Sequence, residues 1–202
     1  SALRGFYKYY CDKLQLIQEN PTKSLDIPKP KKELPKYLTL RESLDLLETI
    51  DGQYRERDYC IITLFLNCGM RLSELVGLNV TDIRPDSTVR ILGKGNKERN
   101  VPISPYLHKV MLKYERMRDY YFDDKIIHDT NYLLSRTGRP LTKEALEHIF
   151  NQANQKAKVR DNIRCSPHTA RHYFAQACLR NGLDLYSVSR LLGHENINIT
   201  KR

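Results

Sequence analysis

The sequence predicts a mainly α-helical domain with a small antiparallel β-sheet, an α+β fold. Apolar residues recur at intervals of three or four over most of the chain, which is the spacing of amphipathic helices. Two short stretches, 88–92 and 99–103, have β-strand character instead, and the glycines and asparagine of 93–97 between them suit a hairpin turn. The longest apolar run, 59–66, is far shorter than the roughly 20 residues of a membrane-spanning helix.

Basic residues outnumber acidic ones. The 202 residues include 34 Lys and Arg against 24 Asp and Glu, which gives a net charge of +10. This excess favours an anionic partner, with nucleic acid the first candidate and an anionic membrane surface the second. Charged residues interrupt the first apolar stretch at Arg4, Lys8 and Asp12, so we expect neither a secreted nor a membrane protein.

The cysteines predict a reduced, cytoplasmic protein. There are five of them, an odd number, and no two form a C-x-x-C pair. A disulfide framework or a structural zinc site would require paired spacing. We therefore expect free thiols and no structural metal.

The N-terminal part predicts one helix followed by a linker. Residues 2–19 have helical periodicity, and Asn20-Pro21 ends the pattern. Three prolines and four lysines follow within 27–36, so this segment is expected to be extended and basic. It is either a tether in solvent or a segment that follows a phosphate backbone. Because one helix cannot bury its own apolar face, we interpret 1–26 as the last helix of a truncated helical domain.

The remaining segment, 37–202, is expected to form one domain. Thr39 and Glu42 have capping-box spacing and begin a helix to about Ile50. A helix at 55–67 carries the long apolar run and is expected to be central. The other expected elements are a short helix at 71–78, helices at about 105–120, 142–157, 167–180 and 184–192, and a short strand at 132–134.

Common metal, nucleotide and hydrolase signatures are absent from the sequence. The 93–97 segment lacks P-loop spacing, and there is no G-x-S-x-G motif. His168 and His172 are four residues apart, but Thr169 stands where a zinc protease helix has glutamate. Asp123-Asp124 is an isolated acidic pair. We expect no metal and no cofactor.

Several cations and imidazoles do occupy special positions. Arg71 follows a Cys-Gly-Met turn and precedes a short helix, and Lys94 lies between two glycines of the expected hairpin. His168 and Arg171 are three residues apart at the start of one helix, so they share a face. His194 follows a helix end at Gly193. Each residue alone is more often a solvated charge or a helix cap than a functional group.

Together, these residues and their contexts resemble the tyrosine recombinase (phage integrase) family, closest to its Xer-like members. The resemblance covers about 37–202. It rests on four segments in order, which are CGMRLSEL at 68–75, GKGNKERNVP at 93–102, HTARH at 168–172 and LLGH at 191–194.

The resemblance implies a catalytic-domain fold and a reaction at a DNA phosphodiester. Arg71 and Arg171 would clamp the scissile phosphate, Lys94 would protonate the departing 5′-oxygen, and His168 and His194 would hydrogen-bond the phosphate or assist proton transfer. In addition, Glu74 would orient the guanidinium of Arg71. The residues expected to hold the DNA backbone are Lys29, Lys31, Lys32, Lys36, Lys97 and Arg99. Family members act on double-stranded DNA as tetramers, so neither a membrane nor a small-molecule substrate is expected.

The family's nucleophilic tyrosine would fall at position 203, one residue past Arg202. We therefore expect this chain to bind the phosphodiester without cutting it. Two alternatives remain open. One is a non-enzymatic helix-turn-helix protein built on 187–200, and the other is a type IB topoisomerase-like enzyme that relaxes DNA.

Overall fold

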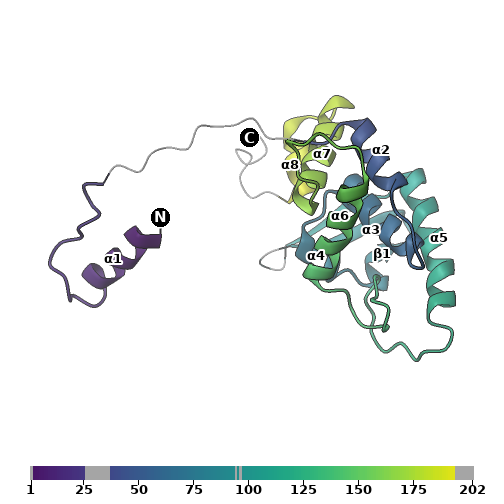
Figure 1. Ribbon diagram of the computed structural model, residues 1–202, viewed down its shortest axis with the longest axis horizontal. Helices are drawn as coiled ribbons and strands as arrows, with labels where there is room; N and C mark the ends of the chain where they lie inside the picture. Colours follow the sequence, from purple (N-terminus) through teal and green to yellow (C-terminus); the bar gives the residue numbers. More distant parts are fainter. Residues whose placement is uncertain (1, 26–36, 94, 96, 194–202) are drawn as a thin grey trace. The chain divides into compact units, whose positions relative to one another are not determined.

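The computed structural model describes residues 2–25, 37–93, 95 and 97–193. The chain divides into two compact units, Ser1–Leu34 and Pro35–Arg202. In its described part, the smaller unit has the helix α1 (Ala2–Asp12), and the larger unit has the other helices and the sheet (Figure 1). The division falls within the expected linker, 27–36, which lies outside the described residues.

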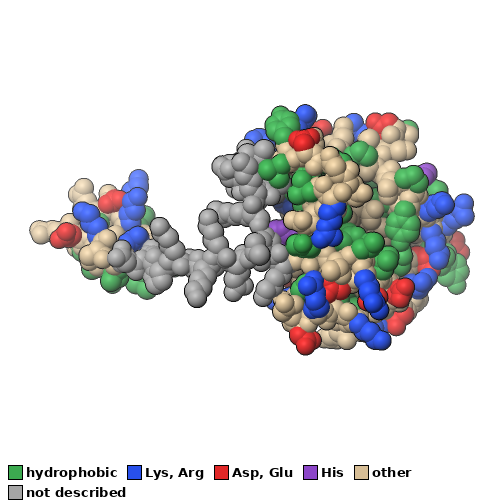
Figure 2. Space-filling model, turned by 90° about the horizontal axis from the view of Figure 1, so that it is seen from above, with side chains coloured by type: hydrophobic (Ala, Val, Ile, Leu, Met, Phe, Trp, Pro, Cys, Tyr) green, Lys and Arg blue, Asp and Glu red, His purple; other side chains and the backbone are tan. Residues whose placement is uncertain are grey.

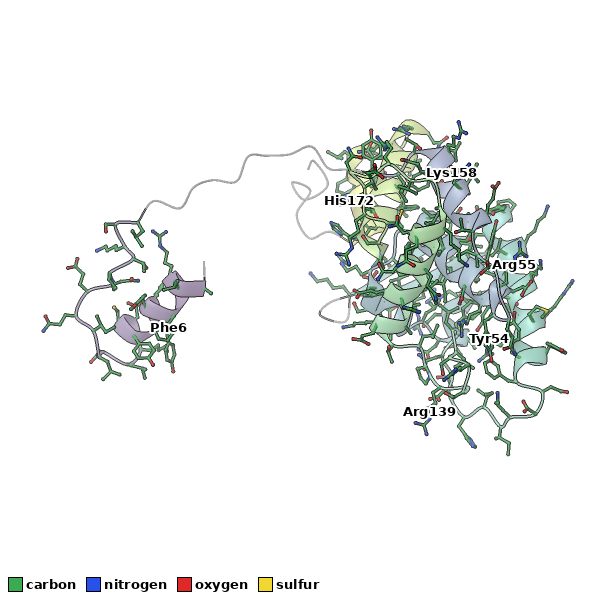
Figure 3. All side chains as sticks on the ribbon, viewed as in Figure 1. Phe6, Tyr54, Arg55, Arg139, Lys158 and His172 are labelled. Atoms are coloured by element: carbon green, nitrogen blue, oxygen red, sulfur yellow. The ribbon has the colours of Figure 1, made fainter. Side chains whose placement is uncertain are left out.

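Helix α1 is shorter than the helix expected over 2–19, so this expectation was wrong in its C-terminal half. Gln15 has left-handed backbone geometry with φ +51°, and the amide of Leu16 bonds back to the carbonyl of Tyr10. Apolar residues continue at helical spacing past this point, so the sequence pattern outlasts the helix. Phe6 is 52% exposed, and no α1 side chain is buried among the described residues (Figure 3).

The helices of the larger unit agree with those expected from the sequence to within a few residues. They are α2 (Leu40–Glu48), α3 (Arg55–Cys68), α4 (Leu72–Val76), α5 (Pro105–Tyr121), α6 (Lys143–Lys156), α7 (Pro167–Arg180) and α8 (Leu185–Leu192). Side-chain caps fix several helix starts: Thr39 and Glu42 form the expected capping box of α2, and Ser166 caps α7 with proline in its first turn.

Helix α3 forms the centre of the core. Its residues from Cys60 to Leu66, and Cys68, are buried. A helix that is buried on all sides needs apolar residues on every face, which explains the long apolar run of the sequence. α3 packs against α5, α7, α2 and α6, and Figure 1 shows these helices around it.

The sheet has three antiparallel strands in the order β1-β2-β3. β2 (Thr88–Leu92) and β3 (Glu98–Pro102) form the expected hairpin, and Gly93 N–H donates to Lys97 O at 2.8 Å. Val89 pairs with Val101 and Ile91 with Arg99, so these residues share the face that packs on the core.

Two details of the sheet region differ from the sequence prediction. A 3₁₀ turn (Val80–Asp82) leads into β1 (Ile83–Arg84). This strand is not predicted from the sequence, because two residues are too few for an alternating pattern. The strand expected at 132–134 is absent. This segment makes only isolated bridges, at Asn131 and Leu134, and packs as a buried loop.

No helix in the described part of the chain is long and apolar enough to cross a membrane. On the face of the larger unit drawn in Figure 2, Lys and Arg side chains lie interspersed with Asp and Glu. The cations of that face are therefore not gathered into one patch.

Candidate functional site

The site begins where α3 ends. Gly69 caps α3 in left-handed geometry with φ +56°, and a Cβ there would overlap the ring of Phe174 from α7. Only glycine allows α3 and α7 to approach this closely. The chain then passes through buried Met70 to Arg71, which is the extended N-cap residue of α4. This turn holds Arg71 at the N-terminus of a short helix, as the sequence predicts.

Glu74 is the buried anion of the site, with a side chain only 3% exposed. It accepts from the backbone N–H of Arg71 at 2.7 Å and from Arg71 Nη1 at 2.7 Å. It also accepts from Arg99 Nη1 at 2.8 Å and Nη2 at 2.6 Å, a bidentate pair. Burial raises the pKa of Glu74, but the hydrogen bonds from Arg99 and Arg71 outweigh it and hold the pKa at about 2.

Arg171 enters the site from the first half of α7. Its side chain is 10% exposed, and its guanidinium donates to the carbonyls of Gly69 and Leu192. Burial, reinforced by the neighbouring charge of Arg71, lowers the pKa of Arg171 to about 9. The guanidinium therefore stays protonated at neutral pH.

The C-terminal end of α8 receives three guanidiniums. Arg99 donates to Leu191 O at 2.7 Å, Arg171 donates to Leu192 O, and Arg71 Nη2 donates to Gly193 O at 3.0 Å. Carbonyls at a helix C-terminus have no partner within the helix and carry the negative end of its dipole. Three cations from three different elements therefore meet at successive carbonyls of one helix end.

His168 lies on α7 one turn before His172. Their Nε2 atoms are 2.9 Å apart, and the rings meet edge to face with centroids 4.3 Å apart. Burial lowers the pKa of His172, and the neighbouring charge of His168 lowers it further. In the sequence, the spacing of this pair indicates only a comparison with a zinc motif. Among the described residues, no group of three or more His, Cys, Asp or Glu side chains is arranged to hold a metal.

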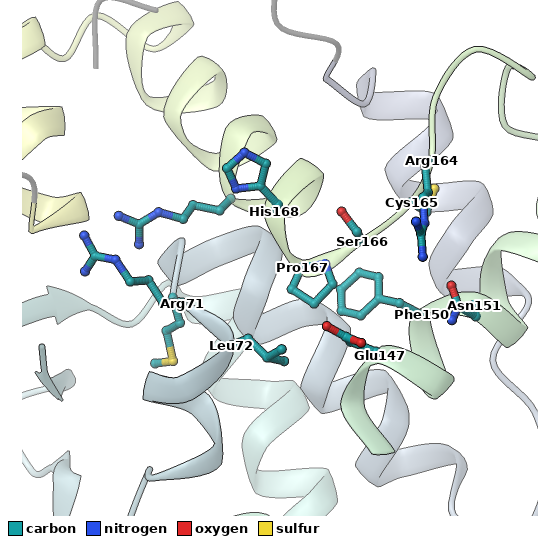
Figure 4. Close-up of a pocket in the computed structure, with 12 residues that line it drawn as sticks. Arg71, Leu72, Glu147, Phe150, Asn151, Arg164, Cys165, Ser166, Pro167 and His168 are labelled. Carbon is teal, nitrogen blue, oxygen red and sulfur yellow. The ribbon is translucent and has the colours of Figure 1, made fainter. Parts of the chain in front are cut away.

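Two pockets meet at Arg71. One, of about 620 Å³, is lined by Arg71, Arg171 and His168 together with residues of α6 and the segment before α7. Figure 4 shows Arg71 and His168 on one side of this pocket and Asn151 and Arg164 on the other. The second, of about 1350 Å³, runs from Arg71 along the β2–β3 hairpin to α8.

The structure thus brings together four of the residues singled out in the sequence: Arg71, Glu74, His168 and Arg171. Lys97 is exposed beside the hairpin, whereas the Arg99 side chain is turned inward and is 9% exposed. The expected site residues that lie outside the described part of the chain are Lys29, Lys31, Lys32, Lys36, Lys94 and His194. Arg99, which the sequence predicted as a contact to the DNA backbone, instead donates to Glu74 within the site, and His172 is a contact of the site that was not predicted.

Comparisons with known proteins agree with the resemblance. The family model for the phage integrase family matches residues 36–202. Tyrosine recombinase XerC of Caldanaerobacter subterraneus subsp. tengcongensis is 39% identical over 202 residues, and XerC of Bacillus subtilis is 35% identical over 206. This chain is matched in full in both cases and spans 56% and 66% of those proteins.

Solved structures of the same kind have a similar fold. The XerA recombinase aligns with a TM-score of 0.73 at 23% identity, covering 99% of this chain and 68% of that one. The XerH site-specific recombinase bound to difH substrate, in a pre-cleavage complex, aligns with a TM-score of 0.71 at 25% identity, covering 84% of this chain and 50% of that one.

Proposed function

Because this chain belongs to the phage integrase family of tyrosine recombinases, we propose that its Arg71, Arg171 and His168 bind the scissile phosphate during site-specific cleavage and rejoining of duplex DNA. The observation that carries the proposal is the convergence of these three side chains on one pocket from two separate elements. Planar guanidiniums can donate two parallel hydrogen bonds to a phosphate, and they stabilise the charge that develops as it reacts.

The reaction would proceed by transesterification. A tyrosine hydroxyl gives up its proton to an imidazole at the phosphate or to water, and its oxygen attacks phosphorus to form a 3′-phosphotyrosyl bond. The bond to the 5′-oxygen breaks, and that oxygen takes up a proton. Rejoining reverses these steps with another 5′-hydroxyl. The energy of the phosphodiester stays in the phosphotyrosyl bond, so the chemistry needs no high-energy cofactor. We assign the tyrosine to position 203 and proton donation to Lys94 on the hairpin, with His194 as a second imidazole at the phosphate.

Glu74 supports this site without touching DNA. It neutralises part of the positive charge and holds Arg71 by both its backbone and its side chain. A buried carboxylate with a pKa of about 2 stays ionised at any working pH, so this restraint on Arg71 is permanent.

The remaining DNA contacts are also part of the proposal. Lys97 is exposed at the end of the hairpin turn, where it can meet a phosphate, and the lysines of 27–36 would follow the backbone as a basic segment. We further propose that the protein acts on two DNA sites as a homotetramer. Arg99 is set apart from these contacts, because its guanidinium faces Glu74.

The test uses the chain extended to a tyrosine at position 203. Nicked duplexes are selected from a random-sequence pool by their binding to this chain and then offered as cleavage substrates in EDTA. A covalent 3′-phosphotyrosyl adduct is expected, and a chain extended with phenylalanine at that position should bind the same DNA without forming it. No adduct on any selected duplex, or an adduct only with added metal, would overturn the proposal.

A second experiment separates an enzyme from a helix-turn-helix binding protein. Arg171→Lys and Arg171→Ala should abolish or strongly reduce adduct formation while weakening DNA binding much less. Equal loss of binding and cleavage would favour the helix-turn-helix alternative. That alternative requires residues 187–200, of which those after Gly193 lie outside the described part.

A further inference from the structure

Arg99 occupies an inward position of the sheet. It pairs with Ile91 across β2 and β3 and shares its face with Val89 and Val101, both buried. A cation on this face loses its water and must recover hydrogen bonds from the protein. Arg99 does so with all three of its nitrogens, two on the carboxylate of Glu74 and Nε on Leu191 O.

Arg71 is held by the same carboxylate and by the same end of α8. Arg71 is held by Glu74 through its backbone and Nη1, and by Gly193 O through Nη2. Arg99 binds Glu74 directly and binds the carbonyl of Leu191, two residues before Gly193. It also lies against Gly193 itself, since a Cβ built there would be 3.1 Å from Arg99 Nη1.

We propose that Arg99 is a positioning residue for the phosphate site: it fixes Glu74 and the last turn of α8 in the places from which they hold Arg71. This inference rests on the proposed function. It gives Arg99 a role in cleavage that does not depend on touching DNA, because the side chain is 9% exposed and each of its three nitrogens already donates to Glu74 or Leu191.

Arg99 also affects the protonation of Glu74. Its carboxylate is 3% exposed, and burial opposes its ionisation. With Arg99 removed, Arg71 remains as its hydrogen-bonded cation, so the carboxylate takes up a proton more readily and loses its hold on Arg71. A purely structural arginine would not change how cleavage depends on pH.

The test measures single-turnover cleavage and DNA affinity of the chain carrying a tyrosine at position 203, on the duplexes selected above. Arg99→Met should slow cleavage by about 100-fold, the effect of a reacting group misplaced by about 1 Å. Its cleavage should also begin to decline in acid at a higher pH than cleavage by the parent chain, because the pKa of Glu74 rises when the hydrogen bonds from Arg99 are lost. DNA affinity should stay within about threefold, since no phosphate contact is removed.

Arg90→Met is the matched control. Arg90 also lies in this sheet and binds a buried carboxylate, with Nη2 2.7 Å from Asp82 Oδ1, but it is on the opposite face and lines neither of the two pockets. Removing it disturbs the sheet to a similar degree and should leave cleavage and its pH profile unchanged. Arg99→Lys should retain part of the activity, because an ammonium keeps the charge but cannot bridge both oxygens.

A variant that leaves a buried charge uncompensated can fail to fold, so the double variant Glu74→Gln with Arg99→Met is measured as well. If Arg99 acts through Glu74, the double variant should cleave about as fast as Glu74→Gln alone, because the two changes remove one interaction. Multiplicative losses would overturn the inference. So would equal losses for Arg99→Met and Arg90→Met, or a loss of DNA affinity as large as the loss of cleavage. If the parent chain itself forms no adduct, the proposed function fails first and the Arg99 variants are not the cause.

Discussion

The Nε2 atoms of His168 and His172 lie 2.9 Å apart, one turn apart on α7. A contact of this length between ring nitrogens requires one to donate N–H and the other to accept through its lone pair, so the two rings cannot both be fully protonated while it exists. His168 lines the pocket with Arg71, whereas His172 is half-buried and does not line that pocket. His172 thus restrains the orientation of the imidazole that we assign to the phosphate.

The first prediction concerns stability and pH. Burial and the charge of His168 lower the pKa of His172 in the folded chain, so the unfolded chain binds its proton at a higher pH. Where the unfolded state binds more protons, stability falls as pH falls. The free energy of unfolding should therefore drop as pH decreases below about 6.5, the ordinary histidine value, and less so in His172→Gln. Urea unfolding across this range measures the difference.

The control for this prediction is His148→Gln, which changes an exposed histidine of α6. This variant should follow the pH dependence of the parent chain. If His172→Gln and the parent chain lose stability in parallel as the pH is lowered, the pKa of His172 is not lowered by burial and by His168 in the way described.

A second prediction concerns the start of the larger unit. Glu42 closes the capping box of α2 with Thr39 and also binds Arg160, with Nε 2.7 Å from Oε1. The hydrogen bond from Arg160, against the opposing effect of burial, holds the pKa of Glu42 at about 2. Glu42→Ala should lower the free energy of unfolding by about 1 to 2 kcal/mol at neutral pH, the range for a lost cap with its partners left unpaired.

This contribution should disappear in acid. A carboxylate with a depressed folded pKa stabilises the fold above its unfolded pKa and loses that effect as pH falls toward the folded value. The gap between the parent chain and Glu42→Ala should therefore narrow from about pH 4.5 down to about pH 2. Asp51→Asn, which removes an exposed ion pair with Lys156, is the comparison and should change stability little. A gap that stays constant in acid would contradict the assignment.

The sequence predicted the helices well because their signals are local. Helical spacing, capping residues and prolines lie within each segment, so α2 to α8 were found to within a few residues. The errors occurred where apolar spacing does not indicate how the backbone turns or whether a segment has a strand partner. The pattern past α1 continues although Gln15 turns left-handed, and the 132–134 segment is buried by packing without a strand partner over its length.

The sequence predicted several residues of the candidate site, but it did not predict which residues contact one another there. Arg71, His168 and Arg171 stand in recognisable segments, but nothing local indicates that three guanidiniums meet the end of α8. For Arg99 one signal was present. It has the same strand parity as Val101 and Ile103, both buried, so an alternating pattern places it on the core face. A cation there implies a buried anion as its partner, although which anion depends on the fold.

A third prediction uses the glycine that ends α8. Gly193 has φ +65°, and a Cβ there would crowd Arg99 Nη1 at 3.1 Å. Gly193→Ala should cost about 1 to 2 kcal/mol of stability from left-handed geometry alone and, in addition, displace Arg99 and slow cleavage. Gly182→Ala separates the two effects, because Gly182 has φ +87° with nothing within 4 Å of the added carbon. It should destabilise to a similar extent while cleavage of the folded protein is unchanged. Similar cleavage by both variants would show that the contact with Arg99 does not matter.

The last prediction tests whether Arg71 must have a guanidinium group, with N–H donors on more than one nitrogen. Its guanidinium donates to Glu74 and Gly193 at once while remaining 38% exposed toward the pocket, a combination that one ammonium group cannot reproduce. Arg71→Lys should therefore retain DNA affinity to within about threefold, because the charge persists, yet slow adduct formation by about 100-fold or more. Both quantities are measured on the chain carrying a tyrosine at position 203, by titration and by single-turnover cleavage.

Arg139→Lys is the matched substitution, since Arg139 is exposed in a loop distant from His172 (Figure 3). It should change neither quantity. Arg71→Lys cleaving at the parent rate would show that charge alone suffices, and the bidentate argument for the phosphate site would then be wrong.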